Sequence, residues 1–94
     1  MARNSNAGKK RVTFEVSAPV GSEVFLAGTF NDWDTSKKPM LDKGTSGLFR
    51  GVVMLPKGRH EYKFLINGDW SMDASNPNFV MSDVGSLNSV IEVQ

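Results

Sequence analysis

The chain has 94 residues, which suits one domain with a single core of two packed layers but is too short for two domains with a cleft between them. It has no cysteine and one histidine, so a disulfide framework, thiolate-bound zinc or iron–sulfur and a thiol nucleophile are excluded. A formal charge of +1 gives no broad electrostatic attraction for nucleic acid. We therefore expect no cofactor, no metal site and no nucleic-acid partner.

Hydropathy predicts no membrane segment. The opening MARNSNAGKK lacks the apolar region of a secretory leader, and no apolar run approaches the roughly 20 residues of a membrane span. We expect a cytoplasmic protein without a membrane partner. Residues 1–10 are interpreted as a flexible polar tail, and residues 11–94 as one domain.

Alternating apolar and polar residues predict the first strands. Residues 11–17 place valine and phenylalanine on one face and polar residues on the other, as in a half-buried strand. Residues 23–30 are a second predicted strand, in which Gly28 marks a bend or a close backbone approach. The polar connection over residues 37–47 contains Pro39 and two glycines, and one short strand fits within it.

The C-terminal half of the chain is also expected to consist of strands and turns. Residues 48–55 and 59–66 are separated by the turn Pro56-Lys57-Gly58. A short strand at residues 70–73, an irregular stretch and a last strand at residues 88–93 follow. No window shows a helical stripe of apolar residues, so we expect an all-β sandwich or small barrel. The predicted core comprises Phe14, Val24, Leu26, Val53, Tyr62, Phe64 and Ile91.

The dipeptide Asn67-Gly68 is a strong signal for a tight hairpin, and the form of that hairpin decides the direction of Trp70. A two-residue type I′ turn pairs Leu65 with Trp70 and turns the indole outward, on the same face as Lys63. A three-residue loop with a bulge at the glycine would instead pair Phe64 with Trp70 and bury the indole. The residues alone leave both registers open.

A second tryptophan, Trp33, lies in the segment GTFNDWDTSKKPM, whose Asn, Asp, Gly and Pro residues are typical of a turn. A large aromatic side chain on a loop can cap one end of a sandwich or can contact a ligand, and the residues do not decide between these roles. Two tryptophans at turns would suit a surface that touches something flat and partly apolar.

Ordered blocks along the chain resemble a known family. The blocks read GTFNDW, LPKGRHEYKFLINGDW, DASNP and DVGSLNSVIEV, and the likeness that they carry extends over roughly residues 11–94. Together they resemble the glycogen-binding domain of the beta subunit of AMP-activated protein kinase, in carbohydrate-binding module family 48. The resemblance implies an immunoglobulin-like, early-set β-sandwich that binds α-1,4-linked glucans such as glycogen, starch and maltodextrins without catalysis.

The resemblance also implies which residues bind sugar. Trp33 and Trp70 match the family's two tryptophans that stack on glucose rings. Lys63 and Asn88 match the lysine and the asparagine that hydrogen-bond to sugar hydroxyls. Because a stacking tryptophan must be exposed, the resemblance favours the outward register of Trp70.

The final loop departs from the family pattern at two positions. Val84 falls where the family has a leucine that enters the ring of a cyclic glucan, and Ser86 falls where it has a threonine. Both side chains are shorter than those of the family, which weakens the apolar insertion but not the stacking platform.

Two other functions compete with glucan binding. Glycoside hydrolysis needs two carboxylates that flank a bond, one of them with a raised pKa, whereas the aspartates here lie in turns where water keeps them ordinary acids. His60 could act as a base only if it faced a site, but it shares its parity with Tyr62, which indicates a core or edge position. We therefore expect no enzyme. A regulatory sandwich that docks a kinase or a glucan-metabolising enzyme would share every folding residue, and it stays the alternative.

Overall fold

The structure is a computed structural model that describes residues 8–94. Its strands are β1 (Lys9–Ser17), β2 (Val24–Gly28), β3 (Leu48–Pro56), β4 (Gly58–Ile66), β5 (Asp69–Ser71), β6 (Phe79–Met81) and β7 (Leu87–Val93). One 3₁₀ turn, η1 (Thr29–Asn31), follows β2. No helix within residues 8–94 is long and apolar enough to cross a membrane. The predicted all-β class is confirmed.

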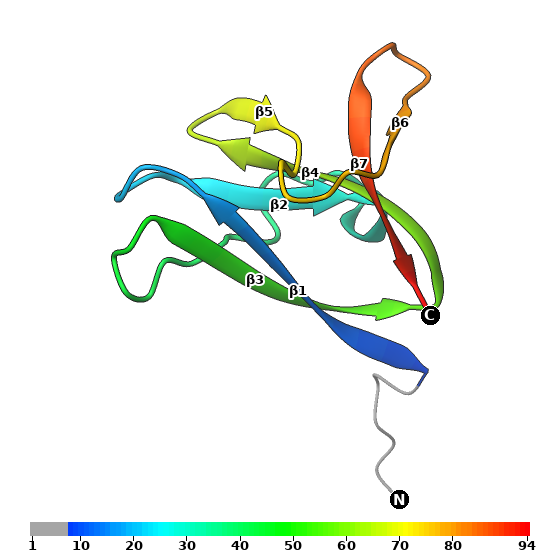
Figure 1. Cartoon of the computed structure of the whole chain (residues 1–94), viewed down its shortest axis with the longest axis horizontal. Helices are drawn as coiled ribbons and strands as arrows, with labels where there is room; N and C mark the ends of the chain where they lie inside the picture. Colours follow the sequence, from blue (N-terminus) through cyan, green and yellow to red (C-terminus); the bar gives the residue numbers. More distant parts are fainter. Residues whose placement is uncertain (1–7) are drawn as a thin grey trace, which may run out of the picture.

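Two antiparallel sheets form the layers of a sandwich. Strand β1 pairs with β3, while the larger sheet has the order β2–β4–β7–β6, with β5 added on β4. Figure 1 shows the two layers one above the other, with the β6–β7 hairpin projecting from the larger sheet. Strand β4 is the centre of that sheet, because it pairs with β2 along one edge and with β7 and β5 along the other.

Apolar side chains between the layers form one core cluster. Its buried members that were predicted from the sequence are Phe14, Val24, Leu26, Tyr62 and Phe64. The predictions for Val53 and Ile91 were wrong, because both side chains are only half-buried at the margin of the cluster. Val53 belongs to the two-stranded sheet, and Ile91 lies beyond the part of β7 that pairs with β6.

The connection between β2 and β3 closes one side of the sandwich. Residues 38–41 pair first with the edge of β2 and then with β3, through backbone hydrogen bonds of 2.8 to 2.9 Å. They form isolated bridges in place of the short strand expected there. Met40 is buried, and its sulfur fills the space beside Gly51, where a Cβ atom would lie only 2.6 Å from it. The core therefore includes a residue from a connection that looks polar in sequence.

Several elements differ from the predicted ones. Strand β1 begins at Lys9 and so includes the last two residues of the expected tail, whereas residues 1–7 of that tail lie outside the described residues. Strand β2 ends at Gly28, where the chain turns into η1. Strand β6 forms within the stretch that was expected to be irregular.

Candidate functional site

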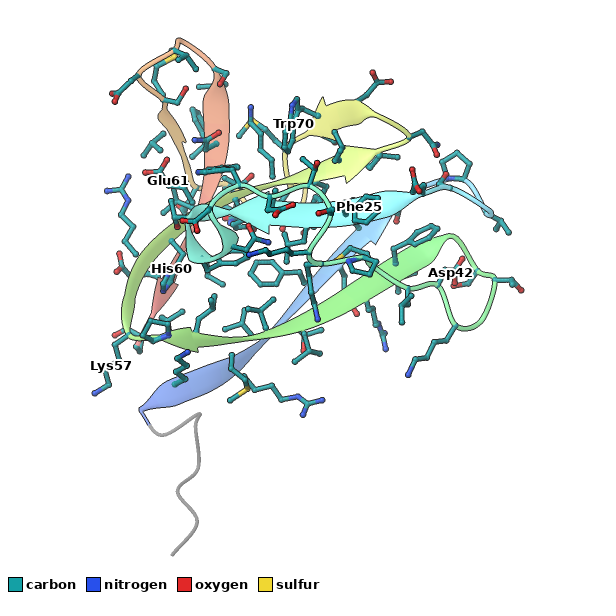
Figure 2. The ribbon with its side chains drawn as sticks, turned by 180° about the vertical axis from the view of Figure 1, so that it is seen from behind. Phe25, Asp42, Lys57, His60, Glu61 and Trp70 are labelled. Carbon is teal, nitrogen blue, oxygen red and sulfur yellow. The ribbon has the colours of Figure 1, made fainter. Side chains whose placement is uncertain are left out.

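The β4–β5 hairpin adopts the two-residue turn and so determines the direction of Trp70. Asn67 and Gly68 have φ angles of 50° and 86°, the left-handed pair that a type I′ turn requires. Leu65 pairs with Trp70, and the Trp70 side chain is 49% exposed. Figure 2 shows this side chain on the side of the larger sheet that faces away from β1 and β3. The outward register is therefore confirmed.

Asn67 also anchors the hairpin to the rest of the sandwich. Its side-chain Oδ1 accepts a hydrogen bond from the Glu23 backbone N–H at 2.9 Å, and its own N–H donates to the Glu23 carbonyl at 2.8 Å. Its Nδ2 donates to the Ser22 hydroxyl at 3.1 Å. An aromatic platform held in this way loses little conformational freedom when it binds a ligand.

The loop that carries Trp33 is held by the side chain of Asn31. Asn31 Oδ1 accepts from the Gly28 N–H at 3.0 Å, and its Nδ2 donates to the Leu26 carbonyl at 3.1 Å. Asp32 and Trp33 then adopt left-handed backbone conformations, with φ angles of 55° and 58°. The Trp33 N–H donates back to the Gly28 carbonyl at 2.9 Å, which holds the backbone from which the indole projects.

The two indoles contact each other and stand nearly at right angles. Their ring centroids lie 6.4 Å apart, and the angle between the planes of Trp33 and Trp70 is 76°. This is the edge-to-face geometry that aromatic pairs favour. The faces of the two rings therefore point in different directions and form two walls of one corner instead of a flat strip.

The loop between β6 and β7 forms a third side of this corner. The Ser82 N–H donates to the Ser86 carbonyl at 2.7 Å, and the two hydroxyl oxygens lie 3.0 Å apart, so the loop is closed at its base. Gly85 adopts a left-handed conformation in this turn, at a φ of 84°. Val84 is 88% exposed, which leaves its methyl groups available for an apolar contact.

Lys63 and Asn88 supply polar groups beside the indoles. Lys63 faces outward from β4, and the only ion pair within residues 8–94 joins Glu15 to Arg50 on the smaller sheet, so the Lys63 ammonium is available as a donor. Asn88 is only 7% exposed, and its Nδ2 donates to Glu61 Oε1 at 3.0 Å. A flexible charged donor and a fixed amide therefore face the same corner.

These elements surround one hollow of about 400 Å³. Its lining residues are Trp33, Lys63, Trp70, Ser82, Val84, Ser86 and Asn88. The structure thus brings together all six residues that the sequence singled out, although their roles in binding stay predictions. Ser82 was missed, because a serine in an irregular stretch carries no signal until the loop closes on Ser86.

The walls of the hollow match the chemistry of a sugar. A pyranose ring presents an apolar C–H face and a rim of hydroxyl groups. Indole faces can cover the apolar side, while an ammonium and an amide satisfy the rim, as small-molecule sites generally combine apolar walls with a few polar groups.

A known family model matches most of the chain. Residues 11–94 match the family model described as the glycogen recognition site of AMP-activated protein kinase. The chain belongs to this family of glycogen-recognition domains. The resemblance inferred from the ordered sequence blocks is thereby confirmed.

The matching relatives are longer proteins. The 5′-AMP-activated protein kinase subunit beta-1 of Sus scrofa is 42% identical over 74 residues, which cover 79% of this chain and 57% of that one. The beta-1 subunit of Rattus norvegicus and the beta-2 subunit of Mus musculus are each 40% identical over 74 residues, with 26% of their lengths covered. The chain therefore spans about a quarter to a little over half of these relatives.

Two titratable groups of this glycogen-recognition domain that lie outside the lining of the hollow have structural roles. Hydrogen bonds from the Ser36 hydroxyl at 2.6 Å and from its backbone N–H at 2.9 Å lower the pKa of Asp34. His60 is half-buried on the opposite face of β4 (Figure 2), with Nε2 2.9 Å from the Pro56 carbonyl. Within the described part of the chain, no three His, Asp or Glu side chains gather as a metal site would need.

Proposed function

We propose that the domain binds α-1,4-linked glucans, such as glycogen, starch and maltodextrins, in the hollow beside Trp33 and Trp70. The observation that carries this proposal is the 76° angle between the two indole planes. An α-1,4-glucan curves, so glucose units along it can meet two inclined walls. A flat cellulose ribbon would instead need coplanar rings in a row.

The polar groups then orient the sugar on the indoles. The Lys63 ammonium donates to sugar hydroxyls, and Asn88 binds another hydroxyl through its amide. Val84 at the mouth of the hollow adds a small apolar contact, and the hydroxyl of Ser86 lies on the same loop. Because the valine is shorter than the family's leucine, the stacking walls supply most of the affinity.

Binding without catalysis is part of the proposal. Hydrolysis of a glycosidic bond requires two carboxylates that face the bond from opposite sides. The lining of the hollow contains no aspartate and no glutamate. A bound glucan would therefore be held and released unchanged.

Co-sedimentation with glycogen tests the proposal. The wild-type domain should pellet with glycogen, while Trp33→Ala and Trp70→Ala should each stay in the supernatant. Phe79→Ala is a matched control, because Phe79 is also an exposed aromatic side chain, at 57%, but lies outside the hollow. Sedimentation that survives loss of both tryptophans would show that the site lies on another face.

The relatives suggest a second role for the same sandwich. Because they are subunits of a kinase, we also propose that the domain associates in the cytoplasm with a kinase or a glucan-metabolising enzyme. A Trp33→Ala/Trp70→Ala double variant that binds no glycogen separates the two roles. Its retention of a protein partner would support the association, and loss of that partner together with glycogen would show that the tryptophans serve both.

A further inference from the structure

A hydrogen bond joins Asn88, which lines the hollow, to Glu61, which lies beside the hollow. Asn88 on β7 and Glu61 on β4 lie on the outer face of the larger sheet, and Asn88 Nδ2 donates to Glu61 Oε1 at 3.0 Å. Glu61 does not line the hollow itself, but it shares an adjoining recess with Asn88 and Trp33. Figure 2 shows Glu61 and Trp70 at separate places along the same sheet.

This bond decides which end of the Asn88 amide faces a ligand. An ionised carboxylate only accepts hydrogen bonds, so the NH₂ end of the amide must turn toward Glu61. Asn88 Oδ1 accepts no hydrogen bond from any residue in 8–94, yet none of the buried side-chain oxygens there lacks a partner. Oδ1 must therefore reach the surface, where Asn88 lines the hollow and the adjoining recess.

Glu61 is held firmly enough to act as such a support. Its backbone N–H donates to the Thr29 hydroxyl at 3.2 Å, which ties it to η1. Gly28, which precedes Thr29, lies so close that an added Cβ atom would clash with the Glu61 carbonyl oxygen. The loop that carries Trp33 and the support of Asn88 therefore meet at one backbone position.

We propose that Glu61 is a positioning residue of the glucan site. By accepting from Asn88 Nδ2, it presents Asn88 Oδ1 to the hollow as an acceptor for a sugar hydroxyl, while Lys63 acts there as a donor. The site then requires one hydroxyl to donate and another to accept. This inference rests on the proposed glucan binding and states which protein group donates a hydrogen bond to the glucan and which accepts one.

Calorimetric titration with maltoheptaose of a set of variants tests the direction. Glu61→Ala leaves the amide free to rotate and should weaken binding about tenfold, the scale of one hydrogen bond to a charged group. Asn88→Asp sets two carboxylates against each other and should weaken binding by at least as much. Glu92→Ala removes an exposed carboxylate of β7 outside the hollow and should bind like the wild type.

A double variant provides the sharpest readout. In Asn88→Asp/Glu61→Gln the hydrogen bond can form again with reversed polarity, because the glutamine amide donates to one oxygen of the aspartate. The second oxygen of the aspartate then faces the hollow as an acceptor. Affinity should return to within about threefold of the wild type. A double variant that binds as weakly as Asn88→Asp alone, or a Glu61→Ala variant with wild-type affinity, would overturn the proposal.

Side-chain NMR of the wild-type protein gives a test that does not depend on any variant folding. The Asn88 Nδ2 protons should keep the signature of a hydrogen bond to a carboxylate after maltoheptaose is added. Their release on titration would mean that the NH₂ group turns to the sugar, and it would overturn the inference. If the wild type gives no heat with maltoheptaose and no shift of any resonance, the proposed function itself fails.

Discussion

Truncation of Trp70 separates its role in binding from any role in folding. The side chain is 49% exposed, and an aromatic side chain buries roughly 150–250 Å² when it is fully covered. A glucose ring that stacks on the exposed half would therefore remove on the order of 100 Å² from water. At about 25 cal/mol per Å², Trp70→Ala should weaken glucan binding by about 2.5 kcal/mol, or roughly 70-fold.

The same substitution should lower folding stability without unfolding the domain. It removes the covered half of the side chain and, with it, the edge-to-face contact with Trp33, which contributes about 0.5–1.5 kcal/mol beyond the area that is buried. For a domain of this size, 1 kcal/mol corresponds to a fall in Tm of about 4–8 °C. The assays are a thermal melt and calorimetry with maltoheptaose, with Phe79→Ala as the exposed aromatic control. A collapse of Tm, or an unchanged affinity, would refute the outward stacking role.

Three further predictions concern the scaffold. Phe64 is fully buried, so Phe64→Ala should cost about 3–5 kcal/mol of unfolding free energy in a urea titration, and a small loss would mean that the core is misplaced. Gly28→Ala should lower both Tm and glycogen binding, because the new methyl group would collide with the Glu61 carbonyl and the Phe30 ring; wild-type binding would show that the Trp33 loop tolerates displacement. Burial raises the pKa of Tyr62 well above its ordinary value near 10. As the pH rises past about 10, the unfolded state loses this proton first, so stability should fall with pH, and Tyr62→Phe should flatten that dependence in urea titrations at pH 8 to 11. An equal fall in the variant would assign the effect to other groups.

Local turn chemistry made the hairpin accessible from the sequence, whereas the choice between its two registers came from the family resemblance. Asn67 and Gly68 tolerate the left-handed backbone that a two-residue turn demands, and the strict alternation along β4 then sets the face of every neighbour. The direction of Trp70 follows from these rules only once the two-residue turn is known to form. The buried faces of β1, β2 and β4 were accessible for the same reason, because alternation shows which side of a strand is apolar.

Features that depend on distant partners could not be predicted from the residues. Met40 is buried only because the connection from β2 to β3 crosses from one sheet to the other and meets the gap beside Gly51. Val53 and Ile91 have the right parity for the core but lie where a neighbouring strand is missing. Periodicity indicates a face of a strand, but it does not indicate whether another layer covers that face.

In the candidate site, too, local features were predictable and features that depend on distant partners were not. Family resemblance named the residues around the hollow, and turn signals placed both tryptophans on loops or hairpins. The 76° angle between the indoles and the bond from Asn88 to Glu61 depend on how β4, β7 and the loop after β2 meet in three dimensions. Neither could be derived from the order of residues along the chain.

Calorimetric titration of the wild-type domain with maltoheptaose and with a cello-oligosaccharide of similar length tests the central claim most directly. The two ligands contain the same glucose units and differ in the linkage, so they differ in curvature and not in composition. Inclined indole walls predict binding of maltoheptaose with a Kd in the micromolar to millimolar range, about −8 to −4 kcal/mol, and much weaker or undetectable binding of the cello-oligosaccharide. Equal affinity for both ligands, or binding of the cello-oligosaccharide alone, would contradict the account.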